Sequence, residues 1–139
     1  MYAANAQSLL NLIRTIPALS AKTGLALGGR GGDAGLADVP VPYCWVLFAG
    51  DENLDSKKEG TVAMVPTLLL RYVVLVGVPY NSESDLLTTE YPLLKQVWQT
   101  INGQQTPSGS KWRYTGTRPP AINPDRLIFT QVFTTIASQ

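Results

Sequence analysis

The chain has 139 residues, of which 45% are hydrophobic and 15% are charged. This length suits one domain, here expected to span residues 1–139, and the composition excludes an intrinsically disordered chain. Eleven Lys and Arg against ten Asp and Glu leave a net charge of +1, so no bulk field exists to hold nucleic acid or an anionic membrane by electrostatics alone.

Apolar residues at helical spacing mark the first element. Leu9, Leu10, Ile13 and Ile16 predict a helix over residues 3–16, which Pro17 ends. The opposite side is polar, so this helix is expected to lie on a sheet or on a neighbouring element.

Residues 18–39 form the second region, and six of the twelve glycines of the chain fall within it. Glycine loses the most backbone entropy on ordering, so we expect a flexible loop here, with Arg30 inside it. Gly29, Gly31 and Ala34 fit a loose dinucleotide-binding pattern. No convincing strand precedes them and no second βα unit follows, so this function is not expected.

The next segments are apolar, with a charged stretch between them. Residues 41–49 are apolar on both sides of an extended chain, which predicts a strand covered on both faces. Residues 51–60 hold six charges and predict an exposed loop or hairpin tip. This tip is either a solvated turn or a contact between subunits.

Two further strands are expected at residues 61–65 and 67–78, separated by Pro66. Arg71 is the one charge in the second of these apolar runs. Two interpretations stay open for it, which are a snorkelling or edge-strand residue and a paired charge at a subunit interface.

A second helix follows, beginning near Thr88 or Thr89 and ending at Gly103. Its broad apolar face carries Leu93, Leu94, Val97, Trp98 and Ile101, and we expect Trp98 to be largely buried against the sheet.

Alternating patterns over 112–117 and 127–136 predict two closing strands, joined by a turn-rich segment TRPPAINPD. The element order is helix, two strands, helix, two strands. It predicts an α+β fold in which an antiparallel sheet of about four strands packs with two main helices.

The residue inventory restricts the chemistry. Histidine is absent, so Ser/His and Cys/His nucleophile pairs cannot form, and a zinc site lacks its usual ligands. Cys44 lies in an apolar run and is expected to be a buried hydrophobe. Asp51, Glu52 and Asp55 come closest to a cation site, but the lysines nearby favour a charged turn. We therefore expect no catalytic residue, metal or cofactor, and no enzyme.

The stretch KWRYTGTR (residues 111–118) alternates aromatic and basic residues. Such a strand can stack bases while it neutralises phosphates. The alternative is an ordinary half-buried strand, with Trp112 and Tyr114 in the core and Lys111 and Arg113 in water.

Four segments, RYVVLVGVPY, EYPLLKQVWQTING, KWRYTG and RLIFTQVFTTIAS, lie in an order and spacing that resemble tail terminator or tail-completion proteins of tailed bacteriophages, particularly the Mu-like group. The resemblance covers residues 41–137 and rests above all on a W-x-Y-x-G strand followed by an R-L-x-F-x-Q-V-F strand. In the first 40 residues the match is limited to a leading helix, and the glycine tract departs from the pattern.

The resemblance implies a tail-terminator-like fold and a subunit of a ring, expected to be a hexamer, at the head-proximal end of the virion tail. This ring would cap the tail tube, stop its growth and join the head, and it would assemble in the host cytoplasm. Its partners would be copies of itself, the tail tube protein and the head–tail connector or neck proteins, while DNA passes through the lumen without sequence readout. No membrane partner is expected.

Residues expected at subunit or tail-tube contacts are Arg30, Asp51, Glu52, Lys57, Lys58 and Arg71. Two alternatives for the function stay open, which are a head-completion or neck connector protein and a small nucleic-acid-binding module that uses KWRYTGTR.

Overall fold

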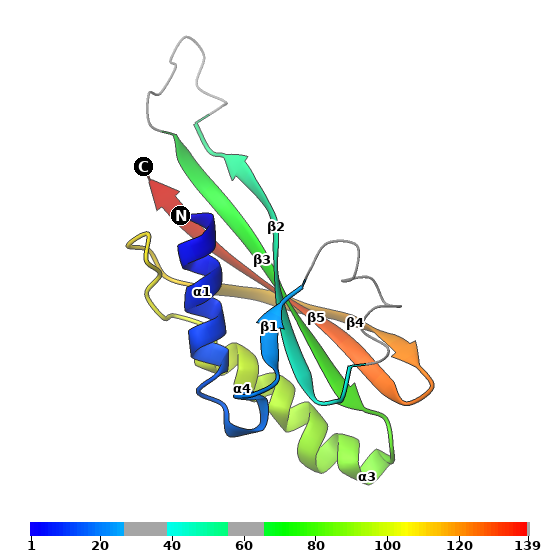
Figure 1. Ribbon diagram of the computed structural model, residues 1–139. Coiled ribbons are helices and arrows are strands. Elements are labelled where there is room, and N and C mark those ends of the chain that lie inside the picture. Colours follow the sequence, from blue (N-terminus) through cyan, green and yellow to red (C-terminus); the bar gives the residue numbers. More distant parts are fainter. Residues whose placement is uncertain (27–38, 56–65, 139) are drawn as a thin grey trace.

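The computed structural model describes residues 1–26, 39–55 and 66–138, and these form five strands and two principal helices (Figure 1). The α+β class is thereby confirmed. The strands are β1 (Thr23–Leu25), β2 (Tyr43–Asn53), β3 (Thr67–Pro79), β4 (Arg113–Asn123) and β5 (Arg126–Ser138). The helical segments are α1 (Tyr2–Ile13), η1 (Pro17–Leu19), α3 (Glu83–Asp85), η2 (Leu86–Glu90) and α4 (Tyr91–Ile101).

The described strands form one mixed sheet in the order β1-β2-β3-β5-β4. All neighbouring strands are antiparallel except β1, which runs parallel to β2. The expectation of about four antiparallel strands is therefore corrected, because Thr23–Leu25 lies in the region expected to be a loop. Backbone pairing with Cys44–Val46 holds this short strand in place. A three-residue segment has too little side-chain alternation to be recognised in a sequence.

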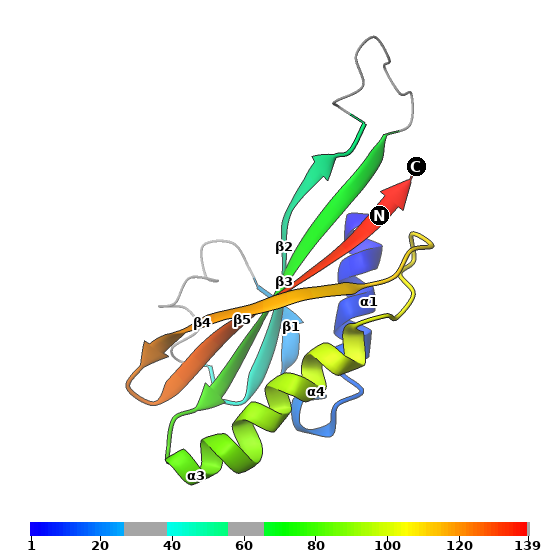
Figure 2. The same cartoon turned by 180° about the vertical axis from the view of Figure 1, so that it is seen from behind.

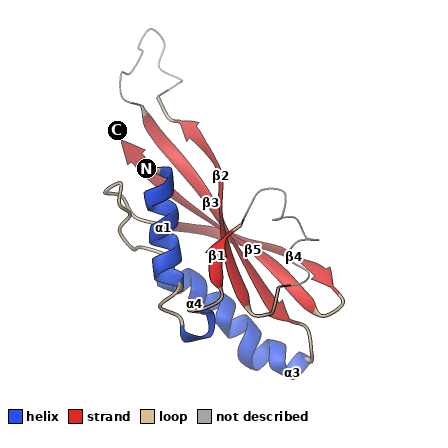
Figure 3. Ribbon diagram, in the orientation of Figure 1, coloured by secondary structure: helices blue, strands red, loops and turns tan. Residues whose placement is uncertain are grey.

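Both helices cover the same face of the sheet (Figures 1 and 3), and the main core lies between them and the strands. Alternate residues of β3 and β5 point into this core because side chains of a strand alternate between its two faces. The core contains Leu9, Leu10, Ile13, Tyr72, Val74, Val76, Val97, Ile101, Trp112, Phe129 and Phe133. The sheet is strongly twisted, so its strands fan out when the molecule is viewed from either side (Figure 2).

The second helical region begins earlier than expected. Its first turn starts at Glu83, where the Ser82 hydroxyl accepts a hydrogen bond of 3.1 Å from the Asp85 backbone N–H. A π-helical turn over Leu86–Glu90 then leads into α4. Pro92 is near the start of α4, directly after this π-helical turn.

Trp98 is partly buried and packs against the main core, at its margin rather than at its centre. Its ring stacks on Tyr114, with centroids 4.9 Å apart and planes 6° from parallel. Trp112 lies deeper in the core, with 1% of its surface exposed and its ring edge-on to Tyr72.

The expected turn TRPPAINPD is also corrected, because β4 continues through Pro119 and Pro120 as far as Asn123. Irregular pairing between Arg118 and Ala121 accommodates the two prolines. β4 is an edge strand, and an edge or a bulge is where a sheet tolerates residues without an N–H.

Candidate interaction surface

The face of the sheet opposite the helices carries an apolar surface that no described helix covers. We call it the open patch, and it consists of Leu47, Leu69, Val73, Val132 and Ile136. Leu47 pairs with Val73 and Val73 with Val132 in one row, and Leu69 pairs with Ile136 in another. The row that contains Arg71 and Thr134 lies between these two apolar rows. Leu47 is 40% exposed and Ile136 is 44% exposed, while the other three are partly exposed. An apolar surface on the central strands of a sheet is a candidate contact site.

The other half of this face is covered by its own small cluster. Tyr43 is fully buried there and lies directly over Gly77, where a Cβ atom would come within 2.2 Å of the tyrosine ring. Ile128, Val41 and Leu75 pack around it. The open patch is therefore limited to the half of the sheet nearer the β2–β3 connection.

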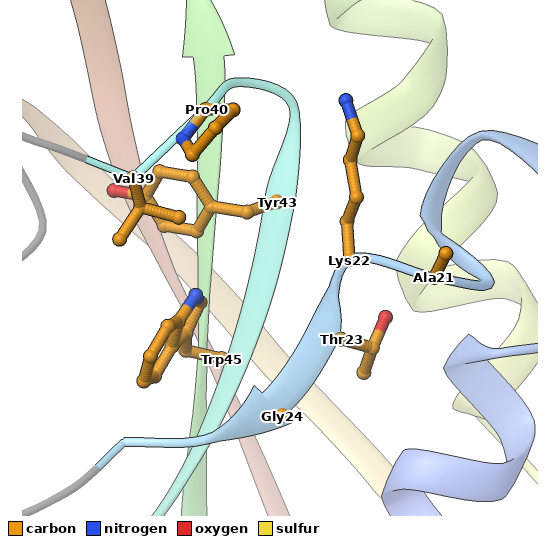
Figure 4. Close-up of a pocket in the computed structure, with 8 residues that line it drawn as sticks. All are labelled: Ala21, Lys22, Thr23, Gly24, Val39, Pro40, Tyr43 and Trp45. Carbon is orange, nitrogen blue, oxygen red and sulfur yellow. The ribbon is translucent and has the colours of Figure 1, made fainter.

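A pocket of about 430 Å³ lies beside this cluster, between β1 and the start of β2 (Figure 4). Tyr43 and Trp45 form one wall, with ring centroids 6.5 Å apart and planes nearly perpendicular. Val39, Lys22 and Gly24 also line it. The described lining offers ring faces and one amine but no carboxylate or thiol. It therefore suits an apolar contact better than acid–base chemistry.

The far half of β2 is an exposed edge. β1 pairs with Cys44–Val46, and no described strand pairs with the outer side of β2 from Leu47 to Asn53. These seven residues are exposed except Gly50, which is partly exposed and stands opposite Arg71 next to a bulge. The expectation of a strand covered on both faces is therefore corrected for this half. Unpaired edges of this kind are where other chains most readily attach.

Asp51 and Glu52 belong to this edge rather than to a loop, which corrects the expected boundary of the charged tip. Asp51 accepts a hydrogen bond from the Tyr2 hydroxyl, and this bond raises the pKa of Tyr2. Glu52 lies 3.8 Å from the Arg71 guanidinium, and both side chains are about half exposed. An exposed pair of this kind contributes about 0–1 kcal/mol.

The structure thus brings together three of the six predicted contact residues, namely Asp51, Glu52 and Arg71. Arg71 lies on β3, which is flanked by β2 and β5, so the edge-strand interpretation was wrong. Its pairing with Glu52 is within the subunit, and a role between subunits stays a prediction. Arg30, Lys57 and Lys58 lie outside the described residues.

The edge strand β4 is basic. Arg113 and Arg118 are exposed, and so is Lys111 just before the strand. Trp112 is buried and Tyr114 stacks on Trp98, which confirms the interpretation of KWRYTGTR as an ordinary half-buried strand. Neither ring offers two free faces to a base.

Buried polar groups serve the fold. Arg126 is 5% exposed and donates to the Asp125 carboxylate at 3.0 Å and to the Val39 carbonyl. This pairing lowers the pKa of Asp125 and raises that of Arg126. The prediction of a buried Cys44 is confirmed, and burial raises the pKa of its thiol.

Among the described residues, no three His, Cys, Asp or Glu side chains gather as metal ligands. Within the same residues, no helix has the length and apolar character needed to cross a membrane.

Comparison with known proteins identifies no family for the chain. No protein-family model matches its sequence. A search of curated proteins finds no significant match either.

Proposed function

We propose that this chain is a tail terminator or tail-completion subunit of a tailed bacteriophage, which assembles into a ring on the end of the tail tube. The ring stops tube growth and offers a surface to which the head joins. Copies of the chain, the tail tube protein and the neck proteins are its partners in this proposal. Binding performs the whole function, and no reaction is required.

The observation that carries this proposal is the open patch on the helix-free face of the sheet. The Leu, Val and Ile side chains of the open patch flank the row of Arg71 and Thr134. Left uncovered in one subunit, these apolar side chains favour burial against another protein. The exposed edge of β2 lies next to it and adds a second surface that a monomer leaves unpaired. The resemblance of residues 41–137 to tail terminators supplies the particular partner.

The structure makes one alternative less favourable. A nucleic-acid-binding module would need the aromatic residues of KWRYTGTR on the surface, because stacking on exposed rings supplies much of the affinity for single strands. Trp112 is instead in the core, and Tyr114 already stacks on Trp98. A head-completion or neck connector protein would use the same surfaces and stays the main alternative.

Polymerisation of the tail tube tests the proposal in vitro. The purified chain is added to tube protein from the same phage while the tubes grow, and tube lengths are measured by electron microscopy. A terminator shortens the tubes in proportion to its concentration and is seen as a ring at one end. Tubes of unchanged length, with rings bound to isolated head connectors, would favour the neck protein instead.

A further inference from the structure

The two lateral edges of the sheet differ in charge. On the β2 side, Asp51, Glu52 and Asp55 accompany one nearby described cation, Arg71. On the β4 side, the strand Arg113–Asn123 contains two arginines and no carboxylate, and Lys111 precedes it. Within the described part of the chain, neither arginine has an ion-pair partner. One edge is therefore acidic and the other is basic.

The acidic and basic groups lie at the same level of the sheet. Gly50 pairs with Arg71, Arg71 with Thr134, and Thr134 with Arg113, so Gly50 and Arg113 stand at opposite ends of one row. Glu52 is two residues beyond Gly50, so its side chain projects from the same helix-free face. Glu52 and Arg113 thus lie on the same face of the sheet but at opposite edges. Along the strand direction they are offset by two residues.

The direction of the strands allows the β2 edge of a second copy to lie alongside the β4 edge of the first. β2, β3, β5 and β4 are antiparallel in succession, so β4 runs opposite to β2. A second copy placed beside the first without being turned over brings its β2 next to β4 and keeps this alternation. The part of β2 without an outer neighbouring strand begins at Leu47. Leu47 pairs with Val73, Val73 with Val132, and Val132 with Gly116, so Leu47 and Gly116 are at the two ends of one row across the sheet.

The backbone of β4 and of the residue before it is occupied in part at this edge. The N–H of Tyr114 donates to the side-chain oxygen of Asn102 at 3.0 Å, and the Trp112 N–H and C=O pair with the 103–104 turn. Pro119 and Pro120 have no N–H to offer. Contact at β4 is therefore made by side chains rather than by a strand added to the ladder.

We propose that copies of the chain meet head to tail, with Glu52 at the β2 edge of one copy against Arg113 at the β4 edge of the next. Lys111, two residues before Arg113, adds to the attraction, and the open patch begins beside this joint, at Leu47 on β2. The inference rests on the proposed ring and names the contact that builds it. A contact between two different edges repeats around a closed ring, whereas a contact between two like edges stops at a dimer.

Charge reversal tests this contact on the purified full chain. Assembly is followed by sedimentation velocity over a range of concentrations, with ring formation checked by negative-stain electron microscopy. The variants are Glu52→Arg and Arg113→Glu. Lys95→Glu on α4 is the matched control, because Lys95 is exposed on a helix that covers the opposite face. Thermal unfolding verifies that each variant is folded.

Each reversal places like charges at every joint, and we expect it to raise the concentration needed for assembly at least about tenfold. An equal mixture of the two variants restores opposite charges at every joint. At one joint the new Arg at position 52 of the first variant meets the new Glu at position 113 of the second. At the next joint the original Glu52 of the second variant meets the original Arg113 of the first. The mixture should assemble within about threefold of the unmodified chain, into rings with an even number of alternating subunits. The Lys95→Glu control should assemble normally.

The inference is overturned if both single variants form rings as readily as the unmodified chain, or if the mixture fails although each variant is folded. Loss of DNA binding by Arg113→Glu with unchanged assembly would also overturn it and assign the basic edge to phosphates. If Glu52→Arg lowers the melting temperature, Glu52→Gln replaces it, with an expected rise of about threefold. Failure of the unmodified chain to form any ring would instead contradict the proposed function itself.

Discussion

Replacing Gly77 by Ala should test the packing beneath the helix-free face. A Cβ atom at this position would lie 2.2 Å from Cε1 and 2.3 Å from Cζ of the Tyr43 ring. The ring is rigid and fully buried, so it must leave the small cluster or push β2 and β3 apart. Overpacking costs about 1–3 kcal/mol and loss of a buried aromatic ring about 3–5 kcal/mol. We therefore expect Gly77→Ala to lower the free energy of unfolding by about 3 kcal/mol.

A double-mutant cycle with Tyr43→Ala separates this clash from other effects of the substitution. Without the ring, Gly77→Ala should be neutral or stabilising by up to about 1 kcal/mol, because alanine restricts the unfolded chain more than glycine does. Urea unfolding followed by tryptophan fluorescence gives the four free energies, and their coupling should be at least about 2 kcal/mol. A Gly77→Ala variant within about 0.5 kcal/mol of the original, a change typical of uneventful surface sites, would refute the placement of the ring.

Three other substitutions and one chemical treatment test buried and partly buried positions. Trp112→Ala should cost about 3–5 kcal/mol, while Trp98→Ala, at a half-buried position, should cost about 1–2 kcal/mol in the same urea assay; equal costs would contradict the assigned depths. Burial raises the pKa of Glu90, with Asp85 adding to the effect, so the folded state resists its ionisation. The folded chain therefore loses stability as pH rises through the range in which the Glu90 carboxyl ionises. Glu90→Gln should be more stable than the original chain at pH about 7. At pH about 3 it should not be, because Glu90 is then protonated in both the folded and the unfolded chain. Cys44 should react with iodoacetamide in urea but not in the folded chain, because burial raises the pKa of its thiol; rapid labelling of the folded chain would contradict this.

Strong periodicity made the larger elements predictable. The helical spacing of Leu9, Leu10 and Ile13, the continuous apolar run of β3 and the alternation in β5 each predicted an element, and the structure has a helix or a strand with buried apolar residues at each of them. β1 was not predicted because backbone hydrogen bonds to β2 hold Thr23–Leu25 in place, and backbone pairing does not require particular residue types. The extension of β4 through Pro119 and Pro120 was missed because edge strands tolerate proline, whereas central strands do not.

The candidate surface was predictable in part. The charges of Asp51, Glu52 and Arg71 were singled out, and the structure places them together at one end of the sheet. Which face carries the open patch could not be inferred, because a continuous apolar run such as residues 67–78 indicates that both sides of a strand are apolar but not which side a helix covers. That choice depends on where α1 and α4 pack, a tertiary property that no local pattern records.

The most direct test of the proposed function is the tail-length distribution of particles assembled without this chain, measured by electron microscopy. A terminator regulates length by capping the tube, so particles without it should have tails well beyond the normal length and heads without tails. Supplying the unmodified chain in trans should restore uniform, joined tails. Tails of normal length on particles lacking the chain would contradict the account, whether or not heads were attached to them.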